Sequence, residues 1–181
     1  EIAGVMELGM INRSEHSEIV AFVGKTVDSE LSGNMIDLCP VGALTSKPFR
    51  YSARTWELDR RRSISPHDGL GSNLVVQTKL NRVMRVLPLE NEAINECWLS
   101  DKDRYSYEAL NSDQRLARPM LKRDGRWQET DWETALDAVC AGLKAAGADL
   151  GALATPHSTL EELYLLGRLA GGLGGGADFR L

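Results

Sequence analysis

Short apolar runs alternate with polar segments in the first two thirds of the chain. The apolar run Ile19–Val23 predicts a strand within an otherwise irregular first stretch, residues 1–58. In the second stretch, Asn73–Thr78 and Arg82–Leu87 are rich in β-forming residues and are separated only by Lys79-Leu80-Asn81. That spacing favours a β-hairpin. The second stretch, residues 59–115, is therefore predicted to be a small β-rich module that begins with a loop, Ser65–Ser72.

The third stretch, residues 116–181, has helical periodicity. Thr130-Asp131-Trp132-Glu133 has the Thr-x-x-Glu pattern of a capping box, and Gly147 predicts the end of the helix that follows. Ser158-Thr159-Leu160-Glu161 repeats this pattern before a second helix, and Leu150–Ala154 between the two predicts a strand. The apolar faces expected for the two helices are Leu136, Val139, Cys140 and Leu143, then Leu160, Leu163, Tyr164 and Gly167. Helix, strand and helix in this order predict the start of an α/β domain.

Composition and charge exclude several classes of protein. The chain has 181 residues, 43% of them hydrophobic and 26% charged, with a net charge of −5. A net-acidic chain is a poor nucleic-acid binder, and Arg60-Arg61-Arg62 is interpreted as a solvated linker at a module boundary. No apolar run of about 18 residues is present, so we expect no direct membrane insertion. Three cysteines, an odd number and far apart, fit a reducing compartment better than a disulfide framework.

Both ends of the chain have the character of cut ends. The first residue is Glu1 rather than Met, no signal peptide is visible, and the last residues, Phe179-Arg180-Leu181, read as part of a strand. We therefore expect an internal fragment of a longer protein.

The pair Cys39-Pro40 carries the most informative chemistry. A thiolate is a soft ligand suited to the iron of a cluster, and cluster-binding runs of ferredoxins end in Cys-Pro. Proline fixes the exit of the chain and removes a backbone donor. The pair alone also fits a buried, unreactive cysteine, so both interpretations stay open at this level.

The longer string around this pair resembles a known family. Residues 32–50, together with residues 53–58, 65–68 and 95–104, are similar to the large iron–sulfur subunit (the G type) of NADH:quinone oxidoreductase, respiratory complex I. The resemblance covers essentially all 181 residues, and the stretch around Cys39 is its most specific part.

The resemblance implies that Cys39 is the fourth ligand of a [4Fe-4S] cluster. The other three ligands of that family form a Cys-x2-Cys-x2-Cys run shortly before a segment like Glu1–Val5, outside this chain. A neighbouring cluster of three cysteines and a histidine lies further upstream, so His16 is interpreted as a surface histidine. Val41, Ala43 and Leu44 are expected to form a dry wall around the cluster.

The second stretch resembles the small cluster module at the front of molybdopterin oxidoreductases. The four positions that carry cysteine in that module are Ser65, Asp68, Ser72 and, before Lys102-x-Arg104, Ser100. Oxygen side chains do not form an iron–sulfur ligand set, so the resemblance implies a module whose cluster ligands are absent. Cys97 is three residues too early for the fourth position and is interpreted as structural, and Cys140 as a core residue.

The letters of the dinucleotide-binding pattern G-x-G-x-x-A are matched by Gly172-Leu173-Gly174-Gly175-Gly176-Ala177, but the structural context of that pattern is not. A dinucleotide-binding loop follows a strand and opens a helix, whereas this run follows a predicted helix and precedes Asp178–Leu181. We interpret it as a loop.

These patterns and the resemblance together predict a mixed α+β and α/β fold in three parts. Residues 1–58 would be the tail of a ferredoxin-like two-cluster module, residues 59–115 the cluster-free module, and residues 116–181 the truncated start of a molybdopterin-oxidoreductase-like α/β domain. The implied function is electron relay from NADH and flavin towards quinone. A molybdopterin enzyme and a redox-inactive docking module remain alternatives. The isolated chain is expected to bind no iron, molybdenum, flavin or nucleotide.

The resemblance also implies the setting. The partners would be other complex I subunits, including the flavin-bearing NADH-binding subunit and the cluster-bearing subunits towards quinone. The location would be the peripheral arm of the complex, on the cytoplasmic side of the bacterial inner membrane or on the matrix side in mitochondria.

Overall fold

The computed structural model describes residues 2–180, apart from the side chain of Val23. The chain divides into two compact units, residues 1–65 with 70–111 and residues 66–69 with 112–181.

The first unit begins with a small hairpin. Strand β1 (Leu8–Ile11) pairs antiparallel with β2 (Glu18–Ala21), and the 3₁₀ turn η1 (Ser14–His16) lies between them. The strand predicted over 19–23 is therefore shorter than expected, because Phe22–Gly24 forms a second 3₁₀ turn, η2. The helix α1 (Asn34–Leu38) and the 3₁₀ turn η3 (Thr55–Glu57) follow.

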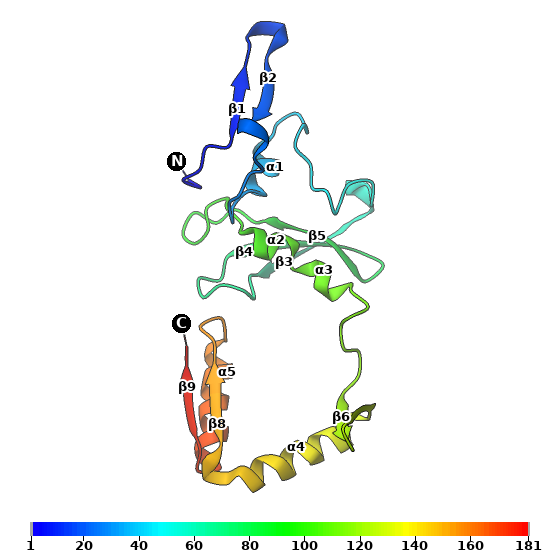
Figure 1. Ribbon diagram of the computed structural model, residues 1–181, viewed down its shortest axis with the longest axis vertical. Coiled ribbons are helices and arrows are strands. Elements are labelled where there is room, and N and C mark those ends of the chain that lie inside the picture. The colour runs from blue at the N-terminus through cyan, green and yellow to red at the C-terminus, as the bar shows by residue number, and fades with distance from the viewer. Residues whose placement is uncertain (1, 181) are drawn as a thin grey trace. The chain divides into compact units, whose positions relative to one another are not determined.

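A three-stranded antiparallel sheet forms the centre of this unit (Figure 1). Its strands are β3 (Asp59–Ile64), β4 (Asn73–Lys79) and β5 (Arg82–Pro88), in that order. The predicted hairpin is confirmed, with Leu80 and Asn81 at its tip in the left-handed region, φ 48° and 62°. A two-residue turn of this kind suits the right-handed twist of the strands.

The interpretation of Arg60–Arg62 as a linker is wrong. These arginines lie within β3 and pair with Gln77, Val76 and Val75 of β4. Every residue of β3 is exposed, and a strand at a sheet edge accommodates charged side chains, which also discourage pairing with another chain.

Two short helices, α2 (Asp101–Tyr105) and α3 (Tyr107–Leu110), contact β5. The core of the unit comprises Leu74, Val86, Leu99 and Tyr107, with Val76 and Val83 packed against it. Leu99 is 1% exposed, so the residues immediately before α2 are anchored in this core.

The second unit contains an antiparallel hairpin, a long helix and a parallel pair of strands. The hairpin is β6 (Met120–Arg123) with β7 (Arg126–Glu129), and α4 (Trp132–Ala146) follows it. After the 3₁₀ turn η4 (Gly147–Asp149), β8 (Gly151–Ala154), α5 (Leu160–Gly172) and β9 (Gly176–Phe179) form a βαβ unit with parallel strands. The predicted helix, strand and helix are confirmed, and Gly147 is the residue that follows α4.

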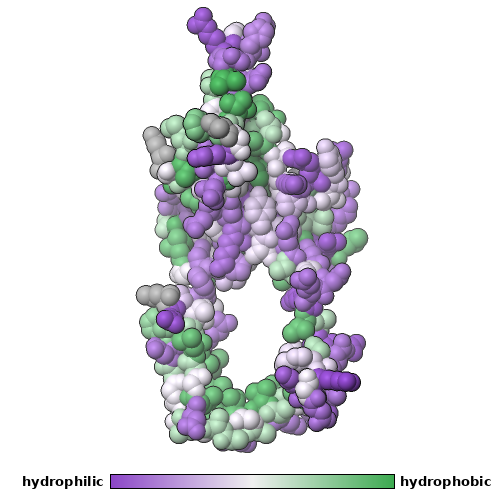
Figure 2. Space-filling view, in the orientation of Figure 1, coloured by the Kyte–Doolittle hydropathy of each residue, from purple (hydrophilic) through white to green (hydrophobic). Residues whose placement is uncertain are grey.

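Both helix starts differ by one residue from the prediction. The side chains of Asp131 and Thr159 accept from the N–H groups of Thr134 and Glu162 and so cap α4 and α5. Most residues of the predicted apolar faces are exposed: Leu136 and Val139 are 55% and 51% exposed, whereas Leu143 of the same face is half-buried. On α5 it is Leu166 and Ala170 that are turned away from solvent. Figure 2 shows apolar surface along α4.

The observed architecture is mixed helix and strand, in agreement with the coarse prediction. Within residues 2–180, none of the helices combines the length and the apolar character needed to cross a membrane.

Candidate functional site

Cys39 is the residue that ends α1. Its N–H donates to the carbonyl of Met35 at 3.1 Å, while its own backbone turns to an extended conformation with ψ 107°. Pro40 follows, and a proline disfavours the helical conformation of the residue before it. The sequence therefore stops the helix at Cys39 and turns the chain into the loop 40–44, where Gly42 adopts a positive φ of 66°.

The loop places backbone N–H groups around the sulfur. The N–H of Ala43 donates to Sγ of Cys39 at 3.2 Å. The N–H groups of Leu44 and Val41, followed by those of Ala43 and Gly42, lower the pKa of the Cys39 thiol, against a smaller opposing effect of burial. Because hydrogen bonds to the charged form favour it, the site stabilises a thiolate.

This arrangement suits one ligand of a soft metal centre. The thiol is half-buried, and backbone N–H groups donating to sulfur are among the features that tune iron–sulfur clusters. The expected dry wall is wrong for two of its three residues, since Val41 is 81% exposed and Ala43 is also exposed. Leu44 is half-buried and lines a cavity of about 430 Å³.

A polar contact joins α1 to the residues at the start of α2. The side-chain amide of Asn34 donates to the carbonyl of Leu99 at 2.9 Å and accepts from the N–H of Leu99 at 3.0 Å. The carboxylate of Asp101 accepts from Ser32 Oγ at 2.5 Å and from the N–H of Gly33 at 2.7 Å. Each bond crosses at least 65 residues of sequence, so tertiary structure alone creates this contact.

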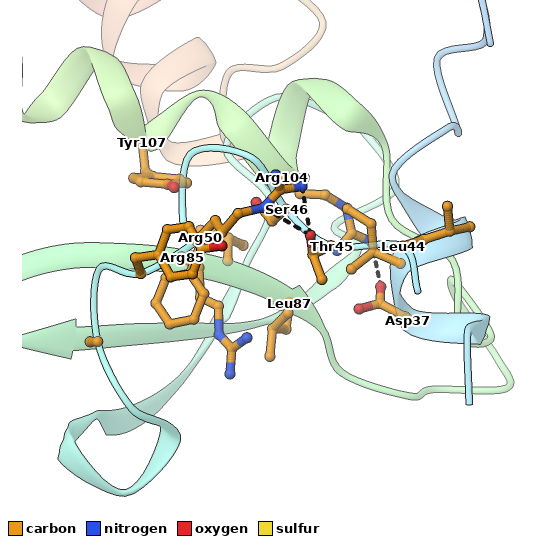
Figure 3. Close-up of a pocket in the computed structure, with 14 residues that line it drawn as sticks. Asp37, Leu44, Thr45, Ser46, Arg50, Arg85, Leu87, Arg104 and Tyr107 are labelled. Atoms are coloured by element: carbon orange, nitrogen blue, oxygen red, sulfur yellow. Dashed lines mark hydrogen bonds and ion pairs between the residues drawn. The ribbon is translucent and has the colours of Figure 1, made fainter. Parts of the chain in front are cut away.

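Arg104 lies at the centre of this contact. Its side chain is 4% exposed, and its Nη2 lies 2.5 Å from Oδ2 of Asp37 and 3.4 Å from Oδ1 of Asn34. Figure 3 draws the bond between Arg104 and Asp37 as a dashed line. Gly33 must be glycine here, because a Cβ at that position would lie 2.5 Å from both Cδ and Nε of Arg104.

The cavity beside Leu44 is lined by further arginines (Figure 3). Arg50 donates to Thr45 Oγ1 at 2.8 Å, and the guanidinium of Arg85 lies 4.2 Å from the centre of the Phe49 ring. Burial lowers the pKa of Arg85, although an arginine retains its charge. Asp37, Leu44 and Arg104 also line this cavity, so it adjoins both the α1–α2 contact and the loop that follows Cys39.

Two of the four oxygen side chains, those of Ser65 and Ser100, are bridged by the carboxylate of Asp103. Ser65 Oγ donates to Oδ1 of Asp103 at 2.6 Å, and Ser100 Oγ donates to Oδ2 at 2.9 Å. Asp103 is 3% exposed, and its N–H donates to Ser100 Oγ, which caps α2. The N–H of Ser65 donates to the carbonyl of Ser72 at 2.8 Å. Asp68 belongs to the other compact unit.

This region therefore does not fit an iron–sulfur cluster. The hydroxyls of Ser65 and Ser100 bond to the carboxylate of Asp103, all four candidate positions carry oxygen side chains, and thiolates are the ligands that such clusters use. Within the part of the chain that the structure describes, no group of three or more His, Cys, Asp or Glu residues is placed to hold a metal ion.

The remaining candidates lie at the surface. His16 has an 81% exposed side chain, 3.7 Å from Glu15, as predicted for a surface histidine. Cys140 is exposed on α4, so its prediction as a core residue is wrong. Cys97 is exposed too, and packing does not support a structural role for it.

The glycine run covers the end of α5 and the start of β9, so the loop interpretation holds only for residues 173–175. The last helical residue is Gly172 and the strand begins at Gly176. Close packing explains one of these glycines: a Cβ on Gly175 would lie 2.4 Å from the carbonyl oxygen of Leu150. Gly175 thus permits the close packing of the βαβ unit, and the run lacks the strand-to-helix setting of a phosphate loop.

Sequence reasoning missed Asn34, Asp37, Asp101, Asp103 and the role of Arg104. One local signal was available, since Ser100-x-x-Asp103 is a helix start of the kind that Ser-x-x-Glu marks elsewhere. The partners of the other residues lie far away in the sequence, and no local pattern predicts them.

Three protein families match consecutive parts of the chain. Residues 1–45 match the ferredoxin-like domain of NADH-quinone oxidoreductase subunit 3, and residues 58–108 match the NADH-ubiquinone oxidoreductase NDSU1/NuoG-like 4Fe-4S domain. Residues 115–178 match the molybdopterin oxidoreductase family.

Curated relatives match nearly the whole chain. The G-type subunit of NADH-quinone oxidoreductase from Rickettsia conorii is 46% identical over 175 residues, which are 96% of this chain and 26% of that protein. The mitochondrial 78 kDa subunit of NADH-ubiquinone oxidoreductase of Neurospora crassa is 43% identical over 177 residues, 96% of this chain and 24% of that protein. The 75 kDa subunit of Reclinomonas americana is 45% identical over 144 residues, 80% of this chain and 21% of that protein. The chain thus spans about a quarter of the length of these relatives.

Proposed function

Because the chain belongs to the family of the G-type subunit of NADH-quinone oxidoreductase, we propose that it forms an electron-transferring, iron–sulfur part of respiratory complex I. In this proposal Cys39 is the fourth ligand of a [4Fe-4S] cluster. When bound, such a cluster accepts and passes on one electron at a time.

One observation carries this proposal. The thiol of Cys39 lies where backbone N–H groups of the loop 40–44 converge on it and lower its pKa. A metal-binding cysteine must be deprotonated, and hydrogen bonds to its sulfur tune the potential of the metal centre. The chain itself would therefore hold one iron and stabilise the negative charge on its ligand.

The other ligands belong to a part of the protein outside residues 1–181. A [4Fe-4S] cluster requires about four ligands, so Cys39 alone cannot hold it. We infer that a Cys-x2-Cys-x2-Cys run of the complete protein supplies the other three cysteines. The isolated chain would accordingly bind no stoichiometric iron.

The region 58–108 serves, in this proposal, as a structural module without its own cluster. Asp103 bridges Ser65 and Ser100 by hydrogen bonds and so ties the end of β3 to the start of α2. Residues 116–181 would be a scaffold at the front of a molybdopterin-oxidoreductase-like domain that has no cofactor role. We propose domain limits of 1–58, 59–115 and 116–181 on this basis.

The complete protein would work in the peripheral arm, on the cytoplasmic side of the bacterial membrane or the mitochondrial matrix side. It would contact the NADH-binding flavin subunit and the cluster-bearing subunits that lead to quinone. The names of the relatives, which are subunits of NADH-quinone and NADH-ubiquinone oxidoreductases, support a place among other subunits. The particular partners are part of the relay role proposed for Cys39.

The test is the variant Cys39→Ala in the assembled complex. One [4Fe-4S] signal should disappear from the electron paramagnetic resonance spectrum and NADH:quinone activity should fall, because one iron loses its ligand. Cys97→Ser and Cys140→Ser are matched controls, since both thiols are exposed and should leave every signal intact. An unchanged spectrum in Cys39→Ala would refute the assignment, and molybdenum in the purified complex would favour a molybdopterin enzyme.

A further inference from the structure

The contact between α1 and α2 is polar and deeply buried. Asn34 is 4% exposed and Arg104 is 3% exposed, and both are bonded across it. A buried charge costs free energy unless it is paired and hydrogen-bonded. Arg104 is a buried charge of this kind, and its partner, Asp37, lies on α1, the helix that precedes Cys39.

The charge pair lies close to the ligand. Asp37 precedes Cys39 by two residues, so their Cα atoms are at most about 7.6 Å apart, given a spacing of 3.8 Å between neighbours. The backbone of Asp37 thus lies within about one Debye length, about 8 Å in physiological salt, of the backbone of Cys39. Arg104 bonds to the carboxylate of Asp37 directly, and its position is fixed by Gly33 on one side and Asn34 on the other.

The same contact fixes the geometry of α1. Asn34, the first residue of the helix, and the two residues before it, Ser32 and Gly33, bond to Asp101 or Leu99. Arg104 adds a bond near the other end of the helix, through Asp37. A helix of five residues that is held at both ends cannot rotate, and the residue that ends it is Cys39.

We propose that Arg104 is a positioning residue for the Cys39 ligand, and that the Arg104–Asp37 pair sets the local charge at the metal centre. This inference rests on the function proposed above. Because the paired groups have no net charge, they leave the redox potential of the centre near the value set by its own ligands. The positive charge of Arg104 alone would raise this potential, because positive charge favours the reduced, more negative state of a cluster, and the negative charge of Asp37 alone would lower it.

The experiment is a redox titration of the assembled complex, followed by electron paramagnetic resonance. The signal measured is the one that Cys39→Ala removes, and the signals of the other clusters serve as internal references. Arg104→Gln should lower the midpoint potential of this signal, because Asp37 is left without its partner. Asp37→Asn should raise it, because the charge of Arg104 remains. The double variant should return towards the wild-type value, and Arg104→Lys should lie closer to wild type than Arg104→Gln.

Asp103→Asn is the matched control. Asp103 is adjacent to Arg104, equally buried and equally part of α2, but it bonds to Ser65 and Ser100 instead of α1. A general loosening of α2 would change the potential in this variant as well, whereas a specific role of Arg104 leaves it unchanged.

The outcomes separate the two proposals. If Cys39→Ala removes no signal, both are refuted. If it removes one signal and that signal has the same potential in Arg104→Gln and Asp37→Asn, or shifts in the same direction in both, only the role of Arg104 is refuted. Should Arg104→Gln lose the cluster altogether, Asp37→Asn decides: an upward shift supports the proposal, and any other result overturns it.

Discussion

The contact between α1 and α2 and the apolar face of α4 show opposite relations between sequence and burial. In the first, polar and charged residues such as Asn34 and Arg104 are almost completely buried. In the second, a helix with a clear amphipathic pattern leaves Trp132, Leu136 and Val139 at least half exposed. An amphipathic pattern thus predicts that a helix forms, but it does not determine what covers the helix.

The difference has a physical reason. Apolar burial is favourable in proportion to the area removed from water, and α4 gains it only where another surface lies against it. The polar residues at α2 can be buried because their partners are present within the same compact unit. Substitutions in the two regions should therefore differ in their cost, most at the core beneath α2 and least on α4.

Leu99→Ala should destabilise the first unit by about 2–5 kcal/mol, since Leu99 is 1% exposed and its loss leaves a cavity in the core. Urea unfolding, together with hydrogen exchange of the amides of β4 and β5, measures this change. A cost below about 1 kcal/mol would show that this core is not the one that holds α2 to the sheet.

Asp103→Ala should cost about 1–3 kcal/mol, because it leaves the hydroxyls of Ser65 and Ser100 without their acceptor. The same unfolding measurement applies. A double-mutant cycle with Ser65→Ala is the control: the two changes should be less than additive if the bond exists, and additivity would argue against the bridge.

Leu136→Ser on α4 should change the stability of the isolated chain by about 0.5 kcal/mol or less, because this side chain is 55% exposed. Here a loss of more than about 2 kcal/mol would mean that α4 is covered in solution, and the comparison with α2 would fail.

The smallest effect concerns the reactivity of Cys39 in the iron-free chain. Hydrogen bonds from the N–H groups of the loop 40–44 lower the pKa of its thiol, so the thiolate persists to lower pH than in a free cysteine. The rate of alkylation of Cys39, followed by mass spectrometry of its peptide, should therefore fall off at a lower pH than the rate of a model thiol. A coincident pH profile would contradict the hydrogen-bonded loop.

The sequence by itself determined the elements whose causes are local. The hairpin of β4 and β5 follows from β-forming residues on both sides of a short turn, and the end of α4 follows from Gly147. The short helix α1 lies in a stretch that the sequence predicts to be irregular. The helices start one residue later than predicted, because Asp131 and Thr159 are as suitable for an N-cap as the preceding residues, Thr130 and Ser158. The three arginines of β3 were misread because solvent-facing charges occur in edge strands as well as in linkers.

Only the tertiary structure decided which residues support the candidate ligand. Cys39 was identifiable from its surrounding string, but the bonds of Asn34 and Asp37 to Leu99 and Arg104 span 65 and 67 residues. The local sequence pattern does not predict that a charged residue is buried. Its burial becomes favourable only when a distant partner is brought within hydrogen-bond distance. Folding of the sheet and α2 into one unit supplies that partner, and so places Arg104 beside the helix that ends in Cys39.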